Sequence, residues 1–323
     1  MKNFRERMLI DRFLQEINWD RKPNNLYEPI AYILSQGGKR IRPHLCLLSA
    51  ELFGTQADKA LIPAASFEMM HNFTLIHDDI MDKADLRRGK PTVYKKWNTD
   101  IAILSGDALY AKAFECMLQY KGDNKLMLLE LLNRTAIEIC EGQQMDLDFE
   151  SLQSVDIADY LEMIRLKTAV MLAACLQAGA LVAAADEKTQ QYIYDFGIKI
   201  GLAFQIRDDL LDVYADADKF GKRNGGDIAE NKKTLLSLKA LETAQGTDAQ
   251  ELKRYFSSAD FDKEEKFCAV KAIYDKYEIK DFAEKLIDAY YREAFASLEK
   301  IQAAPPQKQP LADFVNKLIN REF

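Results

Sequence analysis

Apolar residues recur every three or four positions along almost the whole chain, and this periodicity limits the possible folds more than any other feature of the sequence. Alternating segments of Val, Ile, Thr and Tyr separated by turns, the pattern of a sheet, are nearly absent. The chain is therefore predicted to be all-α. Because its longest helices are apolar on several sides, we expect them in the middle of a bundle of antiparallel helices around a central cavity, where such bundles place their metal sites. The first apolar stripe runs through Phe4, Met8, Leu9, Phe13, Leu14 and Ile17.

Glycine and proline mark the ends of several predicted helices. Gly37 and Gly38 follow the second helix as a C-terminal stop, and Pro43 is well placed to open the third, which ends near Gly54. Pro63 lies near the start, or at a kink, of the helix after that. No linker or change of composition interrupts the chain, so residues 1–323 are predicted to form a single domain. Helices are expected over 4–17, 25–36, 58–82, 98–120, 125–148, 156–185, 187–216 and 231–243, with several shorter ones towards the end, the last after Pro305, Pro306 and Pro310.

Composition argues against several classes of protein. The 323 residues can bury a large core, and the formal charge of −7 argues against nucleic-acid binding, which needs a basic surface. The longest apolar run, 169–185, is shorter than the roughly 20 residues that cross a bilayer and is mostly alanine, so we expect a buried core helix and no membrane span. Five scattered cysteines without metal-ligand spacing, and an N-terminus unlike a signal peptide, indicate a cytoplasmic protein.

Two aspartate triplets with identical spacing stand near the ends of two predicted helices. Asp78, Asp79 and Asp82 form the first triplet, and Asp208, Asp209 and Asp212 form the second. Residues three and four apart are neighbours on a helix, so the carboxylates of each triplet repel one another unless a cation lies among them. Oxygen ligands of this kind suit Mg²⁺, which keeps several waters and shares its coordination with substrate phosphates. A solvated helix face often carries three acids, but two copies, each followed by a basic loop, favour a functional site.

Two groups of cations accompany the aspartates. Lys39, Arg42 and Arg88 make one group, and Arg87, Lys167, Lys222 and Lys232 make the other. Together they carry enough positive charge for two diphosphates, one held through metal and one held directly by arginine. Expelling a diphosphate requires several such groups, because enzymes lower barriers by about 8–23 kcal/mol while one well-placed donor supplies about 2.7–4 kcal/mol. Apolar walls around the site would keep water away from the carbocation that forms.

Seven segments of the chain carry motifs of one known family. They are GGKRIRP at 37–43, HDDIMD with RRG at 77–89, SGD at 105–107, GQQMD at 142–146, KT at 167–168, FQIRDDLLD at 204–212 and GKRNGGDIAENKKTL at 221–235. In these segments the chain closely resembles the all-trans isoprenyl diphosphate synthases, which are head-to-tail prenyltransferases of the farnesyl and geranylgeranyl diphosphate synthase type. The resemblance implies the isoprenoid synthase fold and one reaction. Mg²⁺ draws the diphosphate from an allylic substrate (dimethylallyl, geranyl or farnesyl diphosphate), the double bond of isopentenyl diphosphate attacks the resulting cation, and a proton is lost to the departing diphosphate.

The resemblance also implies a role for each candidate residue. Several magnesium ions would be bound by Asp78, Asp82 and Asp208, with Asp79, Asp209 and Asp212 completing or orienting the metal shell. The allylic diphosphate would be held by Arg87, Lys167, Lys222 and Lys232, with Thr168 and Gln205 lining the reacting centre. Isopentenyl diphosphate would be held by Lys39, Arg42, His71 and Arg88. The residues implied to act in catalysis are Asp78, Asp82, Lys167, Gln205, Asp208 and Lys222.

Phe73 and Thr74, which lie five and four positions before the first aspartate, are implied to form part of the floor of the pocket for the growing chain. An aromatic residue five positions before the first aspartate, with none four positions before it, implies a product of fifteen or twenty carbons. We expect geranylgeranyl diphosphate ahead of farnesyl diphosphate, with a longer polyprenyl product as the other alternative. Helix geometry alone places only Thr74 one turn below Asp78, since Phe73 is rotated by about 140° from it.

Other polar residues of the motifs have simpler explanations. His44 and His77 are expected to pack, and Asp107 and Asp146 to have structural roles. Leu236 stands where the family often has proline, a difference that we expect to matter little.

Two other classes of protein remain to be weighed. A terpene cyclase shares the all-α architecture and the first triplet, but that class usually has a mixed Asn/Ser/Glu motif in place of the second triplet and lacks the GGKRxRP segment. A non-catalytic partner subunit of a heteromeric synthase would be expected to have lost at least one triplet. Members of the family are commonly homodimers, and the predicted helix over 98–120 could supply the interface.

Overall fold

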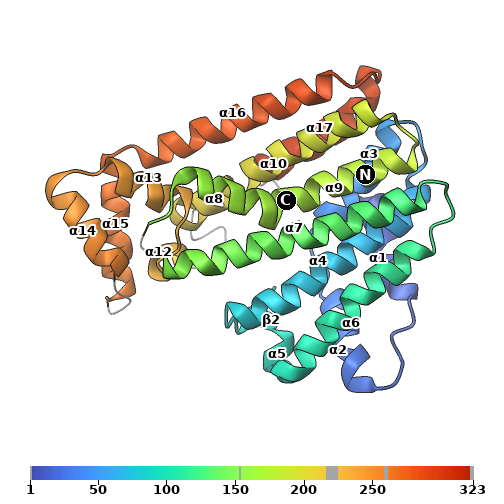
Figure 1. Cartoon of the computed structure of the whole chain (residues 1–323), viewed down its shortest axis with the longest axis horizontal. Coiled ribbons are helices and arrows are strands. Elements are labelled where there is room, and N and C mark those ends of the chain that lie inside the picture. Colours follow the sequence, from blue (N-terminus) through green and yellow to red (C-terminus); the bar gives the residue numbers. More distant parts are fainter. Residues whose placement is uncertain (1, 153, 216–224, 258–260, 321–323) are drawn as a thin grey trace.

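The computed structural model describes residues 2–152, 154–215, 225–257 and 261–320, and these residues are almost entirely helical (Figure 1). The long helices lie alongside one another with their axes in similar or opposite directions, as the periodicity predicted. The described strands, β1 (Leu86–Arg87) and β2 (Lys90–Pro91), form one small antiparallel hairpin. The helical elements are α1 (Lys2–Glu16), α2 (Asn24–Ser35), α3 (Ile41–Leu52), the 3-10 turn η1 (Ala57–Ala60), α4 (Leu61–Met81), α5 (Val93–Lys96), α6 (Thr99–Leu118), α7 (Lys125–Ser151), α8 (Ile157–Ile164), the π-helical segment η2 (Arg165–Ala169), α9 (Val170–Val182), α10 (Glu187–Tyr214), α12 (Gly226–Ala229), α13 (Leu235–Thr243), α14 (Gly246–Ser257), α15 (Lys263–Lys276), α16 (Ile279–Glu299) and α17 (Pro305–Asn320).

The alanine-rich helix α9 lies in the core, where it packs against α3, α7 and α10. Small residues allow this packing. A Cβ atom on Gly179 of α9 would lie 2.3 Å from the carbonyl oxygen of Cys46 in α3, and one on Gly197 of α10 would lie 2.4 Å from the Cα of Ala173. These distances are too short for any side chain, so the composition of α9 follows from the close approach of its neighbours.

The helical segment Ile157–Val182 is long and apolar enough to cross a membrane by length and composition, and 78% of its most apolar window is buried inside the protein. It comprises α8, η2 and α9, and its burial agrees with the prediction of a core helix. One hydrophobic cluster draws residues from α1 to α17. The single domain stays a prediction.

The structure differs from the predicted helices in four places. The final helix, which was expected after Pro310, begins at Pro305 and contains Pro310. The helix expected over 156–185 contains a π-helical segment at Arg165–Ala169, and periodicity cannot reveal one extra residue in a turn. The helix expected over 231–243 begins at Leu235, because Asn231 has left-handed backbone (φ 58°) and Thr234 caps the new helix. The last part of the chain contains α16, a helix of 21 residues, in place of short helices alone.

Candidate active site

The two helices that carry the aspartate triplets end at the same end of the bundle. In Figure 1, α4 runs towards the β1–β2 hairpin and α10 runs towards α12. The surroundings of Lys232, which follows α12, indicate that the two helix ends face each other. Burial acts against its charge, but carboxylates from both sides, among them Asp227 and Asp82, raise the pKa of Lys232. A lysine thus lies between the end of α4 and the segment that follows α10.

In the first triplet, one carboxylate is hydrogen-bonded within the protein, and the other two lie towards the site. Asp79 is buried and accepts hydrogen bonds from Arg87, whose Nε lies 2.8 Å from Oδ1 and whose Nη2 lies 2.7 Å from the same oxygen. Asp78 is half-buried, and burial together with repulsion from Asp82 and Asp79 raises its pKa to about 6, although Lys167 opposes the shift. Asp82 is exposed. A cation beside Asp78 and Asp82 would relieve this repulsion.

The second triplet also has one deeply buried carboxylate that is hydrogen-bonded within the protein. Asp209 is buried and accepts hydrogen bonds from the hydroxyl of Tyr160 (2.5 Å) and from Nε2 of Gln205 (3.2 Å). Burial raises the pKa of Asp209 to about 6 in spite of these donors. Asp212 accepts a hydrogen bond from the backbone N–H of Asp227 (3.0 Å). Asp208 is half-buried on the same turn of α10.

A cavity of about 120 Å³ adjoins the second triplet. In its lining, Thr168 donates a hydrogen bond to Gln205 (3.1 Å), and Lys167 pairs with Asp146 of α7 (2.6 Å). Thr168 and Lys167 belong to the π-helical segment η2, so this irregularity lies at the site, as such segments often do. The residues that line the cavity include Asp146, Tyr160, Lys167, Thr168, Gln205, Asp209, Asp227 and Lys232.

The predicted metal ligands fit magnesium that is bound jointly with a phosphate. In the part of the chain that the structure describes, no three His, Cys, Asp or Glu side chains are gathered tightly enough to hold an ion alone. The pairs Asp78/Asp82 and Asp208/Asp212 each lie one helical turn apart. Mg²⁺ usually takes one or two carboxylates and completes its octahedron with water and substrate phosphates, so such pairs suit it. The assignment of the six aspartates to metal stays a prediction.

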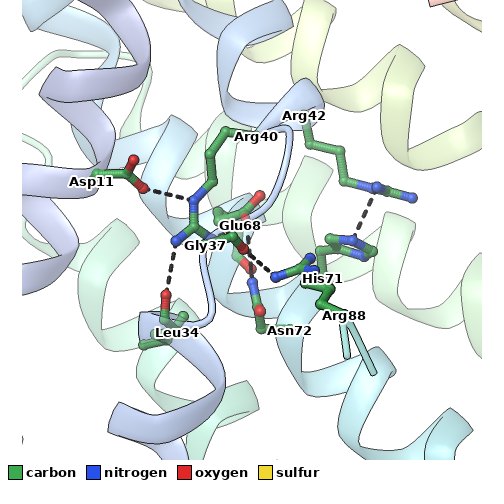
Figure 2. A network of polar contacts seen from close by, with 9 residues as sticks. All are labelled: Asp11, Leu34, Gly37, Arg40, Arg42, Glu68, His71, Asn72 and Arg88. Carbon is green, nitrogen blue, oxygen red and sulfur yellow. Dashed lines mark hydrogen bonds and ion pairs between the residues drawn. The ribbon is translucent and has the colours of Figure 1, made fainter. Parts of the chain in front are cut away.

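A second cluster, in which cations predominate, lies beside α4 (Figure 2). Nη1 of Arg42 lies 3.1 Å from Nε2 of His71, and the buried Nε of Arg42 has no hydrogen-bond partner among the described residues. Burial and the neighbouring arginines hold the pKa of His71 well below its ordinary value, so the imidazole is neutral. Arg88 donates to the carbonyl of Gly37, and Lys39 is exposed nearby in sequence. An unsatisfied arginine atom in a positive environment is suited to an anion.

The structure therefore brings the predicted residues together in two groups. Arg42, His71 and Arg88 lie in one group with Lys39 in the adjoining loop, while Lys167, Thr168, Gln205 and Lys232 lie in the other. Arg87 stands between them, paired with Asp79 and close enough to His71 to lower its pKa. Lys222 lies outside the described residues.

Phe73 and Thr74 point their side chains in different directions. The ring of Phe73 packs edge-on against His77 (centroids 4.8 Å apart) and at a tilt against Tyr110 of α6 (5.1 Å). Thr74 donates a hydrogen bond to the carbonyl of His71 one turn earlier (2.9 Å). His77 also contacts the carbonyl of Ile103 (3.1 Å), so it has the packing surroundings that were expected for it.

Sequence reasoning missed two residues of the site. Tyr160 lies on an ordinary amphipathic helix, and its bond to Asp209 joins residues 49 positions apart, so nothing local indicated it. Asp227 lies inside a motif that was quoted, and burial together with repulsion from Asp209 and Asp212 raises its pKa to about 7. An acid conspicuous among the lysines and glycines of 221–235 was the signal that could have identified it.

Comparisons with known proteins agree with this architecture. Residues 23–275 match the family model for polyprenyl synthetase. The chain is 36% identical to geranylgeranyl diphosphate synthase of Methanosarcina mazei, over 97% of this chain and 95% of that protein, and 39% identical to geranylfarnesyl diphosphate synthase of Natronomonas pharaonis, over 94% and 92%. A crystal structure of geranylgeranyl pyrophosphate synthase superposes with a TM-score of 0.93 at 43% identity, covering 98% of each chain, and that of the Pyrococcus horikoshii enzyme with 0.92 at 34%, covering 98% and 97%.

The fold and the site define the class of protein: an all-α enzyme with two acidic helix ends and two clusters rich in cations. The chain belongs to the polyprenyl synthetase family, the trans-isoprenyl diphosphate synthases that its motifs resemble, and is a prenyltransferase. Membership of this family argues against the alternative that the chain is a terpene cyclase.

Proposed function

We propose that the chain is a short-chain trans-prenyltransferase that condenses isopentenyl diphosphate with an allylic diphosphate and releases diphosphate. The observation that carries this proposal is the pairing of two separate sites within one bundle. Asp78 and Asp82 face Lys167 and Lys232 at one of them, while Arg42 with its unpartnered Nε marks the other. Two substrates that each carry a diphosphate require two such sites.

The first site is suited to the allylic diphosphate. Lys167 and Lys232 would hold the oxygens of the leaving group, together with Arg87 and Lys222, and Thr168 and Gln205 would line the reacting carbon. Magnesium ions, bound by Asp78, Asp82, Asp208 and Asp212 together with the substrate, would neutralise charge on the leaving diphosphate. In this proposal Asp79 and Asp209 orient the site through Arg87 and Tyr160, because their oxygens already accept hydrogen bonds from those residues.

The second site is suited to isopentenyl diphosphate. Arg42, Arg88 and Lys39 would bind its diphosphate, and neutral His71 would donate or accept one hydrogen bond without adding charge. The allylic C–O bond breaks and the electron pair leaves with the diphosphate. The isopentenyl double bond then forms the new C–C bond, and a proton passes from the adjacent carbon to the departing diphosphate. Apolar side chains of α4 and α6, such as Phe73 and Phe114, would exclude water from the cation.

The product is proposed to be geranylgeranyl diphosphate. Relatives at 36–38% identity over most of the chain carry that name, which supports the proposal. The ring of Phe73 contacts Tyr110, whose ring packs edge-to-face against Phe114 (centroids 5.2 Å apart), so three aromatic rings in contact are available to limit the length of the product. The geranylfarnesyl diphosphate synthases among the relatives make a longer product the first alternative, ahead of farnesyl diphosphate.

We also propose a single-domain homodimer in the cytoplasm. Large apolar side chains are exposed on α6 and α7, among them Leu104 (60% exposed), Leu118 and Leu126, and a second copy of this chain could cover them. All five cysteines are free thiols, which fits a reducing compartment.

Incubation of the purified chain with Mg²⁺, isopentenyl diphosphate and each allylic starter in turn, followed by product sizing, tests the proposal. Asp78→Ala and Asp208→Ala should each lower condensation at least a hundredfold, since each removes charge that no other group replaces. Near-wild-type activity of either variant would refute the metal assignment. An inactive wild-type chain would favour the non-catalytic partner subunit.

A further inference from the structure

Arg40 is the one cation of the GGKRIRP segment that is buried, with 5% of its surface exposed, while Lys39 before it is exposed. Its guanidinium donates in three directions (Figure 2). Nε donates to Asp11 of α1 (2.9 Å), Nη1 donates to Glu68 of α4 (2.5 Å), and Nη2 donates to the carbonyl of Leu34 in α2 (2.8 Å). Burial disfavours the charged form, but Glu68 and Asp11 more than offset this and raise the pKa of Arg40. These donors are committed inside the protein and point away from Arg42 and His71.

The backbone around Arg40 is strained. Gly37, Gly38 and Arg40 have φ of 72°, 132° and 50°, so three of four consecutive residues have left-handed or related conformations. A residue with a side chain adopts this conformation only where surrounding contacts compensate for its cost. The three hydrogen bonds of Arg40 supply that compensation. Glu68 is in turn held by Asn72, whose Nδ2 donates to its Oε1 (3.1 Å).

The shape of this loop determines where two of the proposed ligands of isopentenyl diphosphate lie. Arg88 donates to the carbonyl of Gly37, and a Cβ on Gly38 would lie 2.8 Å from the Cζ of Arg88, so the arginine lies directly on the loop. Arg42 lies two residues after Arg40, in the first turn of α3, and extends to His71. A change of backbone at Arg40 would therefore move both arginines.

We propose that Arg40, Glu68 and Asp11 form a buried network that positions the isopentenyl diphosphate site, and that Arg40 acts as a positioning residue and not as a ligand of the diphosphate. The inference rests on the proposed function of that site. It also gives α1 a role, because Asp11 of this N-terminal helix pairs with Arg40 of the loop.

Arg40→Lys and Glu68→Gln test the proposal, with Arg12→Lys as the matched control, since Arg12 pairs with Glu16 on the exposed face of α1. Lysine keeps the charge but cannot donate in three fixed directions. We expect each of the two variants to raise the KM for isopentenyl diphosphate about tenfold, because small misplacements of binding groups cost one to two orders of magnitude. The KM for the allylic substrate should stay within about twofold of wild type, and the double variant should be no worse than the poorer single one. Arg12→Lys should change neither KM.

A direct ligand role for Arg40 predicts a different pattern, in which Glu68→Gln leaves the KM for isopentenyl diphosphate unchanged or lower; that result would overturn the proposal. A parallel rise in both KM values together with a lower Tm would indicate general loss of structure and would overturn it as well. If either variant does not fold, Asp11→Asn, at a side chain 30% exposed, should still raise the KM for isopentenyl diphosphate about threefold.

Calorimetric titration of isopentenyl diphosphate without an allylic partner separates the two hypotheses. If wild type binds it but does not condense it, the proposed function fails while the Kd values of the variants still decide the role of Arg40. If wild type does not bind isopentenyl diphosphate, both fail.

Discussion

Gly142→Ala tests whether close backbone packing places Lys167, a proposed ligand of the allylic diphosphate. Gly142 lies on α7, and a Cβ there would lie 2.3 Å from the backbone nitrogen of Lys167 and 2.8 Å from the carbonyl carbon of Leu166. Both atoms belong to the backbone of η2, so neither can move aside as a flexible side chain would. One turn later on α7, Asp146 holds the ammonium of Lys167 at 2.6 Å. The added methyl group therefore separates the two elements whose contact places Lys167.

The size of the effect follows from these distances. Ordinary contact begins near 3.4 Å, so α7 and η2 must separate by about 1 Å. Overpacking of this kind costs about 1–3 kcal/mol, which for a chain of this size lowers Tm by roughly 2–6 °C. Displacement of a binding group by about 1 Å costs up to a hundredfold, so we expect kcat/KM for the allylic substrate to fall between tenfold and a hundredfold.

Gly197→Ala is the matched control, because a Cβ there would also overlap backbone, 2.4 Å from the Cα of Ala173. Gly197 lies about three turns of α10 before Asp208, away from the site. It should lower Tm by a similar amount while leaving the KM for the allylic substrate nearly unchanged. Steady-state kinetics and thermal unfolding of both variants decide the matter. Equal kinetic losses in the two variants, or wild-type kinetics in Gly142→Ala, would refute the reasoning.

Three further predictions concern single side chains. Phe73→Ala should lengthen the product, and an unchanged product distribution by mass spectrometry would count against its role as a floor. Tyr160→Phe removes a donor to buried Asp209, worth about 1.5–3 kcal/mol to a charged group, so the Mg²⁺ concentration that gives half-maximal activity should rise several-fold in a magnesium titration. His71 should stay neutral at pH 6 in an NMR titration, because burial and Arg42 hold its pKa well below 6.5. Below pH 6.5 the unfolded chain then binds more protons than the folded chain, so the stability that neutral His71 contributes is fully present above that pH and is lost as the pH falls. His71→Gln should flatten this dependence of Tm on pH. An unchanged slope would contradict the prediction.

The features that the sequence determined by itself are those that depend on local helix geometry. Helical periodicity extends over most of the chain, and the long predicted helices correspond to helices in the structure. The spacing of Asp78 and Asp82 places their carboxylates one turn apart on any helix, so the acidic pairs were evident before the fold was known. Gly37 and Gly38 likewise indicated a stop after α2.

Only the tertiary structure decided which of several similar residues faces the site. Asp79 and Asp78 are adjacent in sequence and chemically identical, yet Asp79 is bound by Arg87 from the hairpin while Asp78 faces Lys167. Arg40 resembles its neighbours in the same basic segment, but contacts from α1 and α4 bury it. Such differences arise from partners that are distant in the chain, and a buried charge is stable only where those partners satisfy it. The sequence therefore indicated which residue types meet at this end of the bundle, and the packing of the helices assigned each of them its direction.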